Sequence, residues 1–224
     1  MDMLSWQAIR DAELANWRKL GQGLHARFLI GSFADGARFV SALGEACASG
    51  EHAPEVRLGK GFADVRLRSD DAVKLGTGEG YPNVTQRDVD LARRISSIAQ
   101  SLGLTADPSA VAEVELGLDT ADEAAIGPFW AAVLAGDPGV YDRLDVCDPT
   151  GRVVTLWFQG TDAHETPRQR FHLDLWLPAE VVPARIEAAL AAGGTVVADD
   201  KAPSFTVLAD PEGNKVCLCT YLDR

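Results

Sequence analysis

The sequence predicts an α+β protein of two domains, the first an antiparallel sheet with helices on one face and the second a pair of βαβββ modules. Three observations support this prediction. Apolar residues in the first half recur at helix and strand periods, a turn-forming Asp-Pro-Ser at 107–109 separates the halves, and the second half contains an internal repeat. We therefore expect domains at residues 1–106 and 109–224, each of a usual size for an independent core.

Composition and charge exclude several functions. The 224 residues include 21 basic and 33 acidic side chains, which gives a net charge of −12. Nucleic acids and anionic membranes are bound through a basic face, so we expect neither as a partner. No apolar run approaches the roughly 20 residues that span a bilayer, and the N-terminus lacks the basic start and apolar centre of a signal peptide. The expected location is the cytoplasm.

Local patterns define the elements of the first half. Residues 24–30 are apolar enough for a strand, and Ser32 with Asp35 forms a capping-box start for the helix that follows. We expect this helix to run to about Cys47. Its apolar face carries Phe39, Val40, Leu43 and Cys47.

The same half continues with two strands and a final helix. Residues 56–69 read as two strands, with apolar and charged residues alternating in the second, as in a sheet that is wet on one side. Thr85 and Asp88 open the last helix as a capping box. Its apolar stripe comprises Leu91, Ile95, Ile98 and Leu102. Two amphipathic helices on one face of an antiparallel sheet would bury all of these apolar faces.

The second half repeats itself. Three pairs of segments recur in the same order: 113–118 with 172–177, 131–136 with 188–193, and 148–156 with 210–218. Each copy reads as strand, helix and strands, with an Asp-Pro-x-Gly turn before the last strand. We expect Thr120 with Glu123 to cap the first helix and Pro183 to lie in or near the first turn of the second. Paired modules of this kind can enclose a cleft.

Three segments of the second half, together with the repeat, carry a resemblance: RFHLDLWLP at 170–178, AALAAGG at 188–194 and LADPEGNKVCLC at 208–219. This half resembles the vicinal oxygen chelate superfamily of glyoxalase-like and bleomycin-resistance-like proteins, over about residues 110–222. The resemblance implies paired βαβββ modules around a small-molecule cleft. In metal-dependent members, the first and last strands of each module supply the ligands, usually His, Glu or Gln.

Carried onto this sequence, the ligand positions in the first strands fall on Glu113 and His172. Those in the last strands fall on Thr155 and Cys217. Threonine is a poor ligand and cysteine is a soft substitute for a carboxylate, so only two positions suit a hard or borderline ion. We therefore expect no tightly held metal and no cofactor.

We interpret the cleft as a binding site for a small molecule. The expected substrate-binding residues are Glu113, His172, Trp176 and Cys217. Aromatic walls could come from Trp157, Phe158, Trp176 and Phe205. Neighbouring residues of a strand face opposite ways, so Trp157 and Phe158 cannot both line the cleft, and Trp157 could instead lie on the outer face.

Five pieces of the first half carry a second resemblance: Trp17, the strand and helix at 26–47, EHAPEV at 51–56, VRLRS at 65–69 and VTQRDVDLARRI at 84–95. They resemble pterin-4a-carbinolamine dehydratase over about residues 5–104. The family signature reads His-His-Pro, then a strand ending in Thr-His-Asp or Ser-His-Asp, then an Asp at a helix start. His52 and Pro54 match the first His and the Pro, whereas Ala53 replaces the second His.

Asp70 stands at the later His position of that signature, and Asp88 stands at the helix-start Asp. The resemblance implies a hydro-lyase that dehydrates a 4a-hydroxytetrahydropterin or a similar hydroxylated heterocycle. One group must protonate the departing oxygen, and another must accept the proton of the neighbouring ring nitrogen. Histidine suits both tasks because its unperturbed pKa is about 6.5.

The candidate catalytic residues are therefore His52, Asp70 and Asp88. His52 would act as acid or base, and Asp70 would act as base or would orient His52. Each residue also has a structural interpretation. His52 could lie in a solvated turn, Asp70 in an exposed charged turn, and Asp88 has a complete explanation as the capping-box residue.

Two other functions stay open beside a weakened dehydratase with a degenerate site in each half. The chain could be a non-catalytic binding protein that uses the glyoxalase-like cleft, or a metal-dependent lyase or dioxygenase of the glyoxalase type. In each case the expected partner is a small molecule, either pterin-like or another planar metabolite. Both families often form dimers, so a homodimer is a further expectation.

Overall fold

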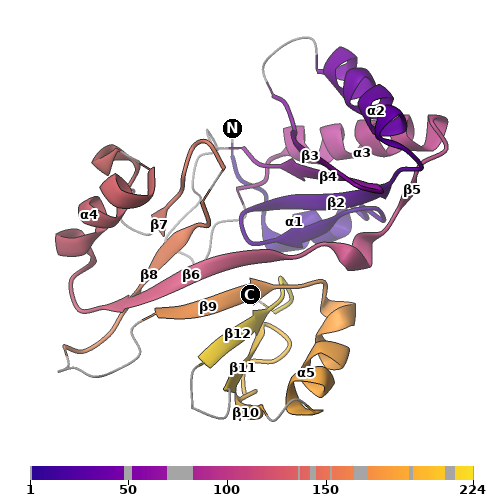
Figure 1. Ribbon diagram of the computed structural model, residues 1–224. Coiled ribbons are helices and arrows are strands. Elements are labelled where there is room, and N and C mark those ends of the chain that lie inside the picture. Colours follow the sequence, from indigo (N-terminus) through magenta and orange to yellow (C-terminus); the bar gives the residue numbers. More distant parts are fainter. Residues whose placement is uncertain are drawn as a thin grey trace. The chain divides into compact units, whose positions relative to one another are not determined.

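The computed structural model is shown in Figure 1. It describes residues 2–47, 52–69, 83–135, 137–141, 145–151, 153–163, 171–191, 194–209 and 215–223. Helices and sheets occur in both halves of the chain, so the predicted α+β class is confirmed. Across these described ranges, no helix is both long enough and apolar enough to cross a membrane.

The chain forms two compact units. The first comprises Met1–Ala112 together with the short segments Pro178–Val181 and Tyr221–Arg224. The second comprises Glu113–Leu177 and Val182–Thr220. The first unit thus takes in two short stretches from the second half of the sequence.

The sheet of the first unit is antiparallel, with strand order β1-β2-β4-β3 and with β5 pairing β2. Its strands are β1 (Arg18–Leu20), β2 (Gly23–Leu29), β3 (Glu55–Gly59), β4 (Phe62–Leu67) and β5 (Thr105–Ala106). Its helices are α1 (Trp6–Asp11), α2 (Phe33–Ala46), α3 (Gln86–Ser101) and the one-turn η1 (Pro108–Ala110). The sequence predicted the longer elements but not β1 or β5.

One face of this sheet carries the core of the first unit. The buried residues of β2 and β4 alternate along each strand and meet in register: Leu24 with Leu67, Ala26 with Val65, and Phe28 with Ala63. Phe39 and Leu43 of α2 and Ile95 of α3 belong to the same apolar cluster. The rings of Phe28 and Phe39 meet edge to face, with centroids 5.2 Å apart. The helices therefore cover one face of the sheet, as predicted.

The capping residue of α2 agrees with the prediction, but two apolar residues that were expected on buried helix faces are exposed. Ser32 Oγ accepts a hydrogen bond from the Asp35 N–H and caps α2. Val40, expected on the buried face, is 37% exposed because it lies about 100° around the helix from Phe39. Leu102 is 42% exposed because α3 ends at Ser101, so the apolar stripe stops one residue short of it.

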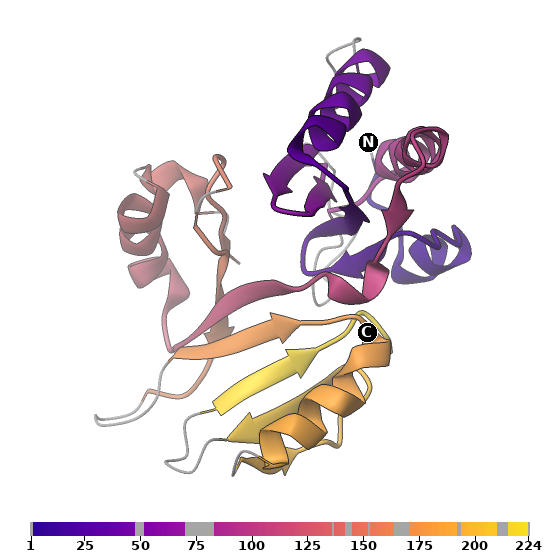
Figure 2. The same cartoon turned by 45° about the vertical axis from the view of Figure 1, so that its right-hand side comes forward.

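The second unit is built on a sheet with strand order β10-β11-β12-β9-β6-β8-β7. Its strands are β6 (Glu113–Thr120), β7 (Asp145–Val146), β8 (Leu156–Gly160), β9 (Phe171–Trp176), β10 (Thr195–Ala198), β11 (Phe205–Ala209) and β12 (Lys215–Cys219). Its helices are α4 (Glu123–Ala135), α5 (Val182–Ala191) and the short η2 (Pro138–Val140), and a further turn, η3 (Ala179–Val181), precedes α5. Figure 2 shows β9, β12 and β11 as neighbouring strands.

The strand order reflects the internal repeat. β6 and β9, the first strands of the two modules, pair with each other in antiparallel orientation. Each also pairs in parallel with the last strand of its own module, β6 with β8 and β9 with β12. The second module runs β9-α5-β10-β11-β12, and the first runs β6-α4-β7-β8 in the residues that are described. The predicted pair of modules therefore forms one continuous sheet.

The helix starts in the second unit test two local predictions. Asp122, not Thr120, caps α4, because Asp122 Oδ1 accepts the N–H of Ala125 at 3.1 Å. Thr120 is the last residue of β6, and its hydroxyl instead accepts the N–H of Asp122 at 3.2 Å. The predicted cap was therefore two residues early. Pro183 is the second residue of α5, where its missing N–H breaks no helical hydrogen bond.

Candidate functional site

Four polar side chains from separate elements of the first unit form a group that we name the His52 cluster: His52, Ser69, Thr85 and Asp88. His52 precedes β3, Ser69 follows β4, and Thr85 and Asp88 begin α3. Nε2 of His52 lies 2.8 Å from Oδ1 of Asp88. The hairpin of β3 and β4 and the start of α3 thus bring together residues 36 positions apart in the chain.

Asp88 is completely buried, and its carboxylate is held from several sides. Its Oδ2 accepts hydrogen bonds from the Ser69 hydroxyl at 2.6 Å and from the Thr85 N–H at 2.7 Å. The Thr85 hydroxyl lies 3.1 Å from the same oxygen. Hydrogen bonds of this kind offset the cost of burying a carboxylate. One oxygen therefore caps α3 while the other faces His52, so the capping and histidine-binding interpretations hold together.

The His52 side chain is mostly buried, with 15% of its surface exposed. An ionised carboxylate can only accept hydrogen bonds, so the contact with Asp88 places the proton on Nε2 of His52. In the neutral ring, Nδ1 then carries no proton and can accept one. A carboxylate in this position orients an imidazole and stabilises its protonated form. The arrangement can therefore accept or deliver a proton at Nδ1.

The other predicted catalytic residue, Asp70, lies outside the described residues. The structure instead shows Ser69 and Thr85 beside Asp88, and sequence reasoning had assigned neither of them to the site. Ser69 occupies the Ser position of the Ser-His-Asp motif quoted above, and that position was the available signal.

The second unit presents a polar face on the side of its sheet opposite α4. Alternate residues of β6 on this side are Glu113, Glu115, Gly117 and Asp119. In the antiparallel register, Gly117 lies opposite His172, Glu115 opposite Asp174, and Glu113 opposite Trp176. Cys217 of β12 lies beside Asp174. The intervening residues of β6 and β8, including Leu118 and Phe158, face α4 and form an apolar core.

The alternation of side chains along β8 shows which of the neighbouring residues Trp157 and Phe158 lies on the polar face. Phe158, expected in a cleft wall, is instead buried in the core under α4, and Tyr141 packs edge to face against it at 5.7 Å. Trp157 lies on the polar face, where its ring meets the His172 ring edge to face at 5.1 Å. The buried indole N–H of Trp176 donates to Glu115 Oε2 at 2.6 Å.

The structure groups some of the predicted substrate-binding residues and separates others. The donor atoms of His172, Asp174 and Cys217 all lie within 4.8 Å of one another. Glu113 lies elsewhere on β6, opposite Trp176. Thr155 lies 3.5 Å from the sulfur of Cys147. Asp174 was missed, although its position two residues after His172 places both on one face of a strand.

This group fits the kind of metal that the superfamily implies, but through a different ligand set. Imidazole nitrogen, carboxylate oxygen and thiolate sulfur together suit a borderline ion such as Zn²⁺. The set expected from the family positions combined residues of both modules, including Glu113 and Thr155. The group observed here comes from the second module alone.

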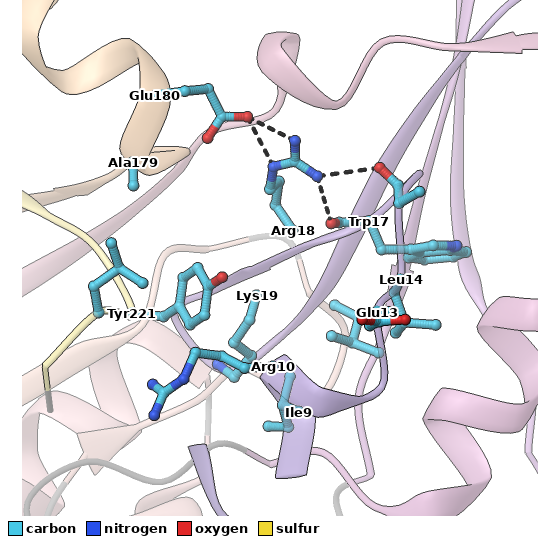
Figure 3. Close-up of a pocket in the computed structure, with 13 residues that line it drawn as sticks. Ile9, Arg10, Glu13, Leu14, Trp17, Arg18, Lys19, Ala179, Glu180 and Tyr221 are labelled. Atoms are coloured by element: carbon cyan, nitrogen blue, oxygen red, sulfur yellow. Dashed lines mark hydrogen bonds and ion pairs between the residues drawn. The ribbon is translucent and has the colours of Figure 1, made fainter. Parts of the chain in front are cut away.

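A separate cavity in the first unit has a volume of about 490 Å³ and was not predicted. It is lined by residues of α1 and β1 and by Glu180 and Tyr221 (Figure 3). Arg18 donates two hydrogen bonds to Glu180 Oε1, at 2.9 and 2.7 Å. Burial raises the pKa of Glu180, but the hydrogen bond from Arg18 and other favourable interactions outweigh burial and hold this pKa below its ordinary value.

The lowered pKa of Glu180 gives a pH prediction for stability. A carboxyl group whose pKa falls on folding adds stability above its unfolded pKa, and loses it as the pH drops through its folded pKa. We expect Glu180→Gln to lower the free energy of unfolding at pH 7 by less than about 1 kcal/mol, because the pair is partly exposed. This difference should be smaller at an acid pH well below the ordinary carboxyl value of 4.5 than at pH 7. Urea unfolding at both pH values, with the exposed Glu187→Gln as control, would measure it, and a difference that grows in acid would contradict it.

Comparisons with known proteins agree with the division of the chain. Residues 3–98 match the pterin 4 alpha carbinolamine dehydratase family, and residues 115–219 match the glyoxalase-like domain family. A Natronomonas pharaonis protein, named as a candidate pterin-4-alpha-carbinolamine dehydratase, is 30% identical over 99 residues, which are 44% of this chain and 98% of that protein.

A solved structure, the transcriptional coactivator/pterin dehydratase from Brucella melitensis, matches with 21% identity and a TM-score of 0.37, over 44% of this chain and 99% of that one. Residues 3–98, which match the dehydratase family, contain the whole His52 cluster. The C-terminal region is similar to glyoxalase-like domains, and the chain belongs to the pterin-4a-carbinolamine dehydratase family through its N-terminal region.

Proposed function

We propose that the N-terminal region dehydrates a 4a-hydroxytetrahydropterin or a similar hydroxylated heterocycle. His52 is the catalytic acid and base in this proposal, and Asp88 is its positioning residue. The observation that carries the proposal is the 2.8 Å contact between His52 Nε2 and a carboxylate that is completely buried. The family membership supplies the class of substrate.

The reaction needs one proton donor and one proton acceptor. The C4a–O bond breaks, the oxygen leaves as water after taking up a proton, and the neighbouring ring nitrogen loses its proton as a C=N bond forms. No electrons are exchanged with a partner, so the reaction requires no oxidant. A protonated His52 can give its Nδ1 proton to the departing oxygen and then take the proton of the ring nitrogen, which restores its starting state.

Asp88 makes a single histidine more effective in these two proton transfers. Its carboxylate faces the protonated imidazole through Nε2 and stabilises the positive charge. The hydrogen bonds from Ser69 and Thr85 fix the carboxylate, and the histidine is fixed in turn. Preorganised charges of this kind need no rearrangement during the reaction.

The proposed role of Asp88 has a kinetic test. Asp88→Asn keeps the size of the side chain but removes its charge, so the protonated imidazole loses its counter-ion. We expect kcat to fall at least about tenfold with little change in KM. A loss confined to KM would contradict a positioning role.

A stopped-flow assay on freshly generated carbinolamine would test the proposed activity itself. The full chain should accelerate loss of the carbinolamine above the rate in buffer, in proportion to enzyme concentration. A rate equal to that of buffer would overturn the proposal.

We also propose that the polar face of the second unit binds a planar small molecule, with Glu113, His172, Trp176 and Cys217 as contacts. Trp157 and the half-buried His172 supply an aromatic surface there. A planar ligand should quench the tryptophan fluorescence, and Trp157→Phe should reduce that quenching. Equal quenching in Trp157→Phe and in Trp6→Phe, a control in the first unit, would argue against this face.

A further inference from the structure

We propose that His172, Asp174 and Cys217 form a site for a borderline divalent cation, Zn²⁺ or Co²⁺, held by the second module alone. We name these three residues the donor triad. Their ligand atoms lie within 4.8 Å of one another. Ligands at about 2.0–2.3 Å from a tetrahedral Zn²⁺ lie about 3.3–3.8 Å apart, so small side-chain movements would complete the site. The proposal does not depend on the dehydratase activity.

Strand geometry explains why these three side chains meet. His172 and Asp174 are two residues apart on β9, so both point to the same side of the sheet. Cys217 of β12 is the parallel partner of Asp174 and points the same way. The backbone of two paired strands therefore fixes the triad, and no loop is needed to bring it together. Sites on such elements are held more closely than sites on loops.

The imidazole of His172 is held in a defined orientation. Its Nε2 lies 3.6 Å from Asp174 Oδ1, and its Nδ1 lies 3.6 Å from Asp119 Oδ1 on the other side. Metal-binding histidines commonly present one nitrogen to the ion and donate the N–H of the other to a carboxylate, which fixes the ring and makes it a better ligand. At 3.6 Å, Asp119 is within a small side-chain movement of accepting such a hydrogen bond from Nδ1. Asp119 is therefore assigned as the residue that orients His172.

Gly117 and Trp157 restrict the same ring. A Cβ atom on Gly117, which lies opposite His172, would overlap the imidazole, so this position must lack a side chain. The ring of Trp157 closes another side. The side chains of His172 and Asp174 are only 16% and 9% exposed, so water competes weakly for the ion.

The charge of the face also favours a cation. Glu113, Glu115, Asp119 and Asp174 share it, and Lys215 at the start of β12 lies on the same side. A divalent ion would offset part of the repulsion between these carboxylates. Binding also requires the thiolate of Cys217, so uptake of the ion should release protons.

Among its described residues, the first module does not provide an equivalent site. By the repeat, Glu113, Glu115 and Thr155 stand where the second module has His172, Asp174 and Cys217. Trp176 donates to Glu115, and the Thr155 position offers a weak hydroxyl ligand in place of a thiolate. We therefore expect one ion per chain.

Titration of the chelator-treated full chain with Co²⁺ would test the site. One equivalent should produce visible d–d bands of a tetrahedral ion and a near-ultraviolet band from thiolate bound to cobalt, and Zn²⁺ should abolish both. Cys217→Ser should remove the thiolate band, and Cys147→Ser, a change of the same kind in the same unit, should leave it intact. A wild-type protein without these bands, or a band that survives Cys217→Ser, would overturn the proposal.

Three further variants test one ligand of the donor triad and two residues that surround His172. Asp174→Asn removes a ligand, and Asp119→Asn and Gly117→Ala disturb only the orientation of His172. We expect each to weaken Co²⁺ binding by about 10–100-fold. Circular dichroism of the metal-free variants would identify any that do not fold. The wild-type chain tests the site without any variant, since Zn²⁺ should protect Cys217 alone from alkylation, and alkylation of Cys217 at an undiminished rate would refute the site.

Discussion

Replacement of His52 with alanine is expected to lower kcat/KM for carbinolamine dehydration by about 10²–10⁴-fold, the usual contribution of a positioned acid–base group. Within the His52 cluster, the imidazole is the group that can transfer a proton to or from a substrate. The Asp88 carboxylate is already engaged, because it accepts hydrogen bonds from Ser69, Thr85 and His52. Stopped-flow kinetics on the folded variant would measure the loss.

His25 provides the matched control for this prediction. It lies on β2, on the face of the sheet opposite the buried residues Leu24 and Ala26, and is not part of the His52 cluster. His25→Ala should retain activity within about a factor of two of the wild type. Equal losses in both variants would indicate a general effect on the fold, and unchanged activity in His52→Ala would remove His52 from the mechanism.

Replacement of Asp88 with alanine is expected to lower the free energy of unfolding by about 2–4 kcal/mol. The loss comes from two buried donors that lose their acceptor, the Ser69 hydroxyl and the Thr85 N–H of the capping box. Each buried group left unsatisfied costs about 1–3 kcal/mol. Urea unfolding monitored by circular dichroism would measure it.

The first turn of α2 supplies the comparison. Asp35 also lies three residues after a capping residue, and its carboxylate accepts from the Ser32 hydroxyl at 2.6 Å, but at an exposed position. Asp35→Ala should therefore cost less than about 1 kcal/mol, because water replaces the lost partner. If the two variants lost equal stability, burial of the Asp88 carboxylate would not explain its importance.

Local patterns were sufficient to predict most of the fold. The four-residue spacing of Phe39 and Leu43 and the alternation along β4 gave the correct buried faces, because helix and strand periods determine which side chains share a side. Val40 shows the limit of this reasoning, since an apolar residue next to a stripe need not be part of it. The internal repeat predicted two modules of strands and a helix, and the structure adds that they share one continuous sheet.

The candidate sites depended on contacts between distant residues. Asp88 is recognisable as a cap from its own neighbourhood, but its contact with His52 requires the hairpin of β3 and β4 to place the two side chains together. Asp174 could have been found from its alternation with His172, yet the expected ligand positions directed attention to Glu113 and Thr155. Which donors meet is decided by strand register, and a repeat alone does not specify register.

The pairing of β6 with β9 means that each module completes the other. Each of these strands has one neighbour from its own module and one from the other copy. A single module, separated from its twin, would leave an unpaired row of backbone amides and carbonyls along an eight-residue or six-residue strand, which is a template for aggregation. Removal of either copy would therefore expose a long sheet edge, whereas exchange of side chains on these strands leaves the backbone pairing intact.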